Sequence, residues 1–158
     1  MAADGSMAGK SVLVTGGTGG IGYATAAGLV RLGARVGIVG RDPSRAEQAA
    51  RELRQIDSAA EVDVFTVDLS SQAEVRRLAD EALATYPRLD VLVNNVGGFW
   101  AHRHETVDGL EYTFALNHLA PFLLTRLLLP RLTENGQARV VTVSAGAQVI
   151  GRIDFDDL

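Results

Sequence analysis

Short apolar runs alternate with longer amphipathic stretches along the chain. An apolar run bounded by turn residues is typical of a buried strand, and apolar residues recurring every three or four positions are typical of a helix. The expected strands are residues 12–15, 35–39, 62–67, 90–93 and 139–144. Strands separated by helices predict an α/β fold in which a doubly wound parallel sheet carries helices on both faces.

The segments between the expected strands have helical spacing. We expect helices over about residues 20–32, 43–56, 71–86 and 107–132. Gly33 and Pro87 are typical of residues at which a helix stops, and Ser70 or Ser71 of an N-cap. The last expected helix is apolar around most of its circumference, so another element or chain is expected to cover part of it.

A glycine-rich turn joins the first expected strand to the first helix. Its sequence is Thr15-Gly16-Gly17-Thr18-Gly19-Gly20-Ile21-Gly22. Glycine permits a tight turn, close approach of main-chain N–H groups to a pyrophosphate, and close packing of helix on sheet. The helix N-terminus adds unpaired N–H groups and the positive end of the helix dipole. We predict a dinucleotide phosphate site formed by Gly16, Thr18, Gly19, Gly20, Ile21 and Gly22.

Composition narrows the class of protein. The 158 residues have the length of one domain, which we divide into a flexible N-terminal tail, residues 1–9, and a cofactor-binding domain, residues 10–158. The net charge of −4 argues against a nucleic-acid partner. The absence of cysteine excludes a disulfide framework and a cysteine zinc site. No segment has the pattern of a signal peptide or a membrane span, so we expect a cytoplasmic protein with no membrane partner.

Further motifs follow the glycine turn in a fixed order. They are Asp68-Leu69, Asn94-Asn95-Val96-Gly97, Asn117, and Gly151-Arg152-Ile153-Asp154-Phe155-Asp156-Asp157-Leu158. With the glycine turn, they resemble the short-chain dehydrogenase/reductase family, in particular its retinol-dehydrogenase-like branch, over nearly the whole chain. The resemblance implies a Rossmann-type sheet in the order 3-2-1-4-5, incomplete relative to the family, and a nicotinamide cofactor. It also implies hydride transfer between that cofactor and a small carbonyl or alcohol substrate.

The resemblance assigns cofactor contacts to single residues beyond the glycine turn. It implies that Asp68 and Leu69 contact the adenine. It also implies that Asn94, Val96 and Gly97 line the cofactor site.

The charge after the second expected strand indicates which nicotinamide cofactor is bound. An NAD site needs a carboxylate there, to accept a hydrogen bond from the ribose 2′-hydroxyl. Here Gly40 is followed by Arg41, whose guanidinium can hold a 2′-phosphate through charge-assisted hydrogen bonds. Asp42 is better explained as the N-cap of the helix that begins near Pro43. We therefore predict NADP; the alternative is that Arg41 and Arg45 only line a solvated helix start.

The catalytic residues of the family are only partly matched. Asn117 takes the position of an asparagine that, in the family, orders the backbone and a proton-relay water. Ser144 takes the first of two serine positions, and Ala145 takes the second, which is the catalytic one in the family. Adjacent strand residues point to opposite faces, so we do not expect Ser144 to replace the missing hydroxyl. No tyrosine among the 158 residues is followed by lysine four positions later, so they lack the Tyr-x-x-x-Lys pair.

The segment after the fourth expected strand leaves two alternatives open. His102 and His104 have no evident third ligand, so we expect no metal site; they belong either to a solvated loop or to a substrate loop. Phe99 and Trp100 either wall a substrate pocket or pack on the last helix.

The last expected strand predicts that the chain has a partner. Residues 139–144 would form an apolar sheet edge beside the leucine-rich last helix. This surface predicts a homo-oligomer or a partner chain. The acidic residues Asp154, Asp156 and Asp157 are expected to form a solvated tail.

Three hypotheses of function follow. The first is the cofactor-binding part of an NADP-dependent oxidoreductase whose catalytic remainder lies outside these residues. The second is a non-catalytic NADP-binding interaction or sensor module, which Ala145 favours. The third and weakest is an enzyme in which His102, His104 or a partner's residue supplies the proton.

Overall fold

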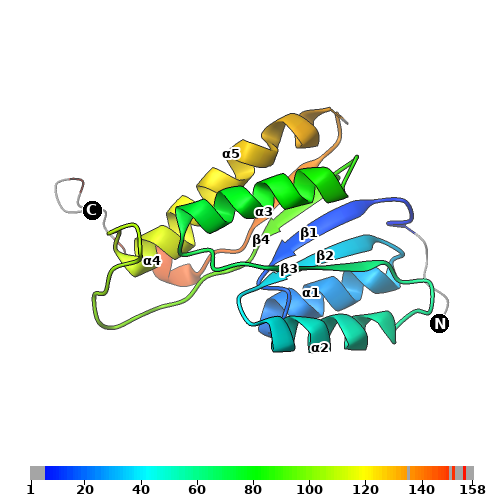
Figure 1. The fold of residues 1–158 in the computed structure, drawn as a ribbon, viewed down its shortest axis with the longest axis horizontal. Coiled ribbons are helices and arrows are strands. Elements are labelled where there is room, and N and C mark those ends of the chain that lie inside the picture. The colour runs from blue at the N-terminus through cyan, green and yellow to red at the C-terminus, as the bar shows by residue number, and fades with distance from the viewer. Residues whose placement is uncertain (1–5, 135, 150, 152–154, 156–158) are drawn as a thin grey trace.

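The structure is a computed structural model that describes residues 6–134, 136–149, 151 and 155. In this part of the chain, five parallel strands form one sheet in the order β3-β2-β1-β4-β5. They are β1 (Ser11–Thr15), β2 (Arg35–Gly40), β3 (Val62–Thr66), β4 (Val91–Asn94) and β5 (Arg139–Thr142). Helices α1 (Gly20–Arg31) and α2 (Pro43–Arg54) cover one face, and α3 (Gln72–Thr85) and α5 (Ala120–Thr133) cover the other (Figure 1). The predicted doubly wound sheet and its strand order are confirmed.

Both faces of the central strands are buried, which explains their unbroken apolar runs. Along β1, Val12 and Val14 pack into the core that α1 and α2 cover, whereas Leu13 packs into the core under α3 and α5. Alternate residues of a strand point to opposite faces, so one apolar run supplies both cores.

Local signals place the helix ends on the first face. Gly33 follows α1 with a φ of +85°, a left-handed conformation that glycine adopts without a steric penalty. Asp42 caps α2, because its Oδ1 accepts a hydrogen bond from the Arg45 N–H at 3.1 Å. The predicted N-cap role of Asp42 is confirmed.

The helix expected over residues 107–132 begins later than predicted. Residues 106–109 form a turn in which Gly109 has a φ of +71°. The first helical turn is α4 (Tyr112–Phe114), and the Glu111 carboxylate caps it by accepting two of its backbone N–H groups. Although burial raises the pKa of Glu111, these backbone donors hold it below its usual value. The predicted start at residue 107 is wrong because the helical spacing of apolar residues continues across this turn.

The expected long helix is also interrupted in its middle. Residues Ala115–Leu119 form a π-helical turn, in which the Ala120 N–H donates to the Ala115 carbonyl, five residues back. Pro121 explains the wider turn. It has no N–H to donate to the Asn117 carbonyl, and its ring crowds that oxygen. The regular helix α5 therefore starts only at Ala120.

The N-terminus of α3 is capped from outside its own segment. Ser71 occupies the N-cap position, but its side chain makes no capping bond. Instead, Asp108 Oδ2 accepts a hydrogen bond from the Gln72 N–H at 2.8 Å, across 36 residues of chain. The predicted N-cap position is therefore correct, but a carboxylate from a distant loop, and not the serine side chain, supplies the capping bond.

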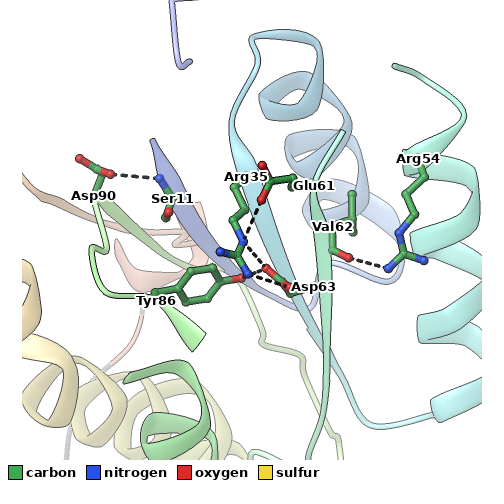
Figure 2. Close-up of polar contacts among 8 residues, drawn as sticks. All are labelled: Ser11, Arg35, Arg54, Glu61, Val62, Asp63, Tyr86 and Asp90. Carbon is green, nitrogen blue, oxygen red and sulfur yellow. Dashed lines mark hydrogen bonds and ion pairs between the residues drawn. The ribbon is translucent and has the colours of Figure 1, made fainter. Parts of the chain in front are cut away.

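A polar cluster joins β2, β3 and the end of α3 at the amino edge of the sheet (Figure 2). Arg35 Nε and the hydroxyl of Tyr86 both donate to Asp63 Oδ2, each at 2.8 Å. Tyr86 is fully buried, and a Cβ on Gly37 would lie only 2.4 Å from its hydroxyl oxygen. Burial raises the pKa of Tyr86, and the nearby Asp63 carboxylate raises it further. A phenol at this position thus stays protonated while it donates to the carboxylate.

The last strand of the sheet leaves apolar side chains exposed. β5 ends at Thr142, two residues before its predicted end, and only β4 pairs with it. Val140 and Val141 are 42% and 46% exposed. Phe122 and Leu129 of α5 are also exposed, while Leu124 and Leu128 of that helix are buried.

Several expectations fall on residues outside the described part of the chain. These are residues 1–5 of the tail, the turn at Asn135, and the acidic residues Asp154, Asp156 and Asp157. Within the described part of the tail, the Met7 N–H donates to the Leu32 carbonyl at 2.9 Å. A search of the described helices finds none that is long and apolar enough to cross a membrane.

Candidate cofactor-binding site

The glycine turn after β1 leaves no room for side chains at its centre. Gly16 and Gly20 have φ values of +68° and +53°. A Cβ on Gly22 would lie 2.2 Å from the Gly16 carbonyl oxygen, so α1 packs directly against the turn. The Gly17 N–H donates to the Val39 carbonyl at 3.2 Å, which ties the turn to β2. The turn therefore presents backbone rather than side chains.

The N-terminus of α1 opens on this turn. Its N-cap is Gly19, which makes no side-chain cap, and the first N–H groups of a helix have no partner within it. Among the described residues, no atom beyond the neighbouring residues and the backbone of α1 lies within 4 Å of where a Gly20 Cβ would stand. Unpaired N–H groups, the helix dipole and open space together form a site that favours an anion.

A second turn, after β4, is joined to the glycine turn through Thr15. The Thr15 hydroxyl oxygen accepts the Asn95 and Val96 N–H groups at 2.9 and 3.1 Å. In return, Asn95 Nδ2 donates to the Thr15 carbonyl at 2.9 Å. A Cβ on Gly16 or Gly22 would come within 2.8 Å of that same Nδ2, so the two turns fit closely. The network holds both turns in one arrangement.

A cavity of about 340 Å³ lies beside these turns, at the carboxyl ends of the strands. Its lining is Gly16, Thr18, Arg41, Asp42, Arg45, Val67, Asp68, Leu69, Val96, Gly97, Trp100, Tyr112 and Leu116. Ligands of open α/β sheets bind at this edge. The predicted cofactor residues that it brings together are Gly16, Thr18, Arg41, Asp68, Leu69, Val96 and Gly97.

The remaining predicted cofactor residues lie around the cavity. Gly19 lines a neighbouring hollow with Thr18 and Arg45. Ile21 is exposed on α1, and Gly20 and Gly22 belong to the first turn of that helix. Asn94 is buried, and its Nδ2 donates to the Thr125 hydroxyl at 3.1 Å, which fastens β4 to α5. The structure therefore gives Asn94 a supporting position beneath the cavity.

Two cationic side chains belong to the cavity lining. Arg41 and Arg45 are both exposed, and Arg41 directly follows β2. A terminal nitrogen of Arg45 lies 3.4 Å from where a Gly19 Cβ would stand, close to the glycine turn. Asp42 also lines the cavity, but its Oδ1 already accepts the Arg45 N–H. This end of the cavity suits a ligand with anionic groups.

Asp68 and Leu69 close the cavity after β3. Asp68 Oδ1 accepts the Ser70 N–H at 2.9 Å, which holds the carboxylate near its own backbone. Asp68 is otherwise exposed, while Leu69 is buried. The pair offers one polar acceptor and one apolar surface.

Asn117, in the π-helical turn, is bonded to the segment after β4. Its Oδ1 accepts the Gly98 N–H at 3.0 Å, and its Nδ2 donates to the Gly98 carbonyl at 2.8 Å. A Cβ on Gly97 would lie 3.1 Å from Asn117 Oδ1. Both polar groups of the side chain thus order the backbone beside the cavity.

The comparison with protein families agrees with this geometry. The family model for short chain dehydrogenases matches residues 10–155. The chain belongs to the short chain dehydrogenase family. A human relative, retinol dehydrogenase 14, is 47% identical over 98% of this chain and 50% of its own length, which supports the retinol-dehydrogenase-like branch.

Solved dehydrogenase structures share the fold. The Pseudomonas aeruginosa RhlG/NADP active-site complex has a TM-score of 0.80 and 36% identity, over 98% of this chain and 61% of that one. A metagenomic short-chain oxidoreductase in complex with NADP has a TM-score of 0.79 and 31% identity, over 89% and 64% of the two chains. The chain spans about half the length of the curated relative that it matches.

The two positions that the resemblance assigns to the family's serines lie outside the sheet. Ser144 and Ala145 follow β5 and are both exposed. The strand ends at Thr142, so the predicted strand end at residue 144 is wrong and strand alternation does not decide which way Ser144 points. That Ser144 does not replace the missing hydroxyl stays a prediction. The alanine at 145 still has no hydroxyl to bond a carbonyl oxygen.

The sequence does not predict several of the cavity's lining residues as cofactor contacts. From the sequence we expect Arg45 only at a solvated helix start, and Tyr112 and Leu116 only within the last helix. The spacing of four between Tyr112 and Leu116 places them on one helix face, which is the one available signal. Trp100 packs against Tyr112 of α4, which lies in the expected last helix, and this agrees with its second predicted alternative. Trp100 also lines the candidate cofactor cavity, and a role in a substrate pocket stays a prediction. Phe99, in contrast, is 86% exposed.

Two further observations bear on where a ligand could bind. Among the described residues, no group of three or more histidine, aspartate or glutamate side chains could hold a metal ion. A larger, open hollow of about 730 Å³ lies at the amino edge of the sheet, beside Lys10 and Asp90. Asp90 there already accepts a hydrogen bond from Lys10 Nζ at 3.1 Å. It also accepts one from the Ser11 N–H at 3.0 Å (Figure 2). The smaller cavity at the carboxyl edge is therefore the candidate site.

Proposed function

We propose that residues 10–158 form the NADP-binding part of a short-chain dehydrogenase/reductase oxidoreductase. The observation that carries this proposal is one cavity that joins the glycine turn to two arginines. NADPH, when bound, would supply hydride to the carbonyl carbon of a small substrate, and NADP would accept it from the corresponding alcohol.

The residues present fit such a cofactor. The glycine turn, Thr18 and the N-terminus of α1 would hold the pyrophosphate, since they offer backbone N–H groups without side chains in the way. Asp68 and Leu69 would contact the adenine. Asn94, Val96 and Gly97 would support the cofactor at the end of β4, and Asn117 orders the backbone there.

The choice of NADP over NAD follows from charge. A 2′-phosphate would meet the guanidinium of Arg41, and Arg45 adds a second cation to the same cavity. The carboxylate that follows Arg41 in the chain, Asp42, already accepts the Arg45 N–H as the α2 cap and so is less free to accept a hydrogen bond from a ribose hydroxyl. Two of the similar structures, RhlG and the metagenomic oxidoreductase, are complexes with NADP, which supports this choice.

Calorimetry with NADPH and NADH tests the proposal. We expect wild-type protein to bind NADPH at least tenfold more tightly, since a charge-assisted contact contributes about 1.5–3 kcal/mol. Arg41→Ala should erase most of the difference by weakening NADPH alone. Arg51→Ala is the matched control, because Arg51 is exposed near the end of α2 and does not line the cavity. Equal affinities of the wild type for both dinucleotides would end the NADP assignment.

Ala145 favours a second candidate, a non-catalytic NADP-binding interaction or sensor module. No Tyr-x-x-x-Lys pair occurs in the 158 residues, whose only lysine is Lys10. We expect this chain by itself to bind NADPH without reducing a panel of aldehydes and ketones. The absorbance of NADPH measures this directly, and consumption above a no-protein control would contradict it.

The exposed surface of β5 and α5 supports the expectation of a homo-oligomer or a partner chain. Sedimentation of the wild type should show association, and Val141→Lys should weaken it by placing a charge on the exposed strand. A monomer at all accessible concentrations would leave only the partner-chain alternative. A cytoplasmic location stays a prediction from the sequence.

A further inference from the structure

Two aromatic side chains belong to the lining of the cavity. The rings of Trp100 and Tyr112 have centroids 4.7 Å apart at an interplanar angle of 75°, an edge-to-face pair. We call this pair the aromatic wall. His104 supports it from outside the lining, with its ring centroid 4.7 Å from that of Tyr112.

The backbone holds the aromatic wall in place. The Tyr112 N–H donates to the His104 carbonyl at 2.9 Å, and Glu105 and Glu111 form an isolated antiparallel bridge. On the other ring, a Cβ on Gly98 would lie 2.6 Å from Trp100 Cη2, so the missing side chain makes room for the indole. Gly98 is itself fixed by both hydrogen bonds to Asn117. The two rings are therefore positioned before any ligand binds.

The rest of the lining indicates what the wall would meet. Arg41 and Arg45 suit phosphate groups, and Asp68 is a hydrogen-bond acceptor for an amino group. Leu69 and the aromatic wall add apolar surface to the same cavity. A ligand that combines phosphate, an exocyclic amino group and a flat ring is an adenine nucleotide. Ring faces of this kind hold a base by stacking or edge contacts.

We infer that Trp100 and Tyr112 bind the adenine base of the dinucleotide. Through this contact with the adenosine half, they raise the affinity of the protein for the cofactor. This inference rests on the proposed function. The nicotinamide is not the group concerned, because the two arginines in the same cavity suit the 2′-phosphate of the adenosine ribose. The aromatic wall should therefore contribute to binding affinity even when the ligand lacks the nicotinamide half of the dinucleotide.

Adenosine 2′,5′-bisphosphate separates the two halves of the cofactor, since it carries the adenine and the 2′-phosphate but no nicotinamide. Trp100 is the single tryptophan of the chain, so tryptophan fluorescence reports on the aromatic wall alone. We expect the bisphosphate to change Trp100 emission. By calorimetry, we expect Trp100→Ala and Tyr112→Ala each to weaken its binding about tenfold. Trp100→Phe keeps a ring and should recover most of the affinity.

Phe99→Ala is the matched control, because Phe99 neighbours Trp100 but is outside the cavity lining. It should leave the affinity unchanged. A thermal melt of each variant establishes that it folds. Wild-type binding with unchanged affinity in folded Trp100→Ala and Tyr112→Ala would overturn the aromatic wall and leave the proposed function standing. No binding of the bisphosphate or NADPH by the wild type would overturn both.

Discussion

Asn95 Nδ2 donates a hydrogen bond to the Thr15 carbonyl at 2.9 Å, across 80 residues of chain. The Thr15 hydroxyl oxygen in turn accepts two N–H groups from the turn after β4. The two turns that border the cavity are thus fastened to each other at their bases. The shape of the cavity depends on this exchange rather than on either turn alone.

Thr15→Val should therefore loosen both turns. Valine has nearly the shape of threonine but leaves two N–H groups without their acceptor, and one buried unpaired group costs about 1–3 kcal/mol. We expect the free energy of unfolding to fall by about 2 kcal/mol and NADPH affinity to fall with it. Thr15→Ser keeps the hydroxyl and is the control. Urea unfolding and calorimetry measure the two effects. A valine variant as stable as the wild type would show that the Thr15 hydroxyl does not hold the two turns.

Gly22→Ala should destabilise the fold and Gly28→Ala should stabilise it, although both residues lie in α1. The Gly22 Cβ would meet the Gly16 carbonyl oxygen at 2.2 Å, so the alanine must push the helix off the glycine turn. Gly28 has free space around it, and alanine is favoured over glycine inside a helix by about 1 kcal/mol. We expect loss of NADPH binding in the first variant and a raised melting temperature in the second. Similar melting temperatures for the two would refute this reading of the turn.

Tyr86→Phe should lower stability and change its dependence on alkaline pH. A hydrogen bond to a charged group contributes about 1.5–3 kcal/mol, so we expect a loss of about 2 kcal/mol near neutral pH. Burial raises the pKa of Tyr86 in the folded protein, while the unfolded tyrosine ionises near pH 10. Above pH 10 the unfolded state therefore loses the proton that the folded state keeps.

The sign of this effect is a fall in stability as the pH rises. For one proton the slope reaches about 1.4 kcal/mol per pH unit. Tyr86→Phe removes this contribution, so its stability should decline less steeply between pH 10 and 11 than that of the wild type. Urea unfolding at several pH values measures both slopes. Parallel curves would show that Tyr86 ionises as easily in the folded protein as in the unfolded chain.

Asp108→Ala and Ser71→Ala distinguish the two possible caps of α3. Asp108 accepts the Gln72 N–H, whereas the Ser71 side chain makes no capping bond. Loss of an N-cap costs about 1 kcal/mol, so Asp108→Ala should lower the free energy of unfolding by that amount. Ser71→Ala should change it by less than half as much. A larger loss of stability in Ser71→Ala than in Asp108→Ala would show that the serine expected from the sequence caps the helix.

The sequence by itself determined the order of the strands and helices, the glycine turn and the Asp42 cap. These features depend on residues close together in the chain: an apolar run forms a strand, and Asp42 bonds an N–H three residues on. The family motifs added the strand order and the lining residues Asp68 and Gly97, and the charge after the second strand added Arg41. The start of the last helix was missed, because its apolar spacing runs on through the Gly109 turn.

Only the tertiary structure decided which distant residues meet. Asp108 reaches α3, Asn95 reaches Thr15, and Trp100 and Tyr112 come together in the lining of the cavity. No local pattern encodes these contacts, because each joins separate segments whose relative positions are set by how the helices pack on the sheet. The glycine turn marks where a dinucleotide is expected, and the packing around it decides which surfaces that ligand would meet.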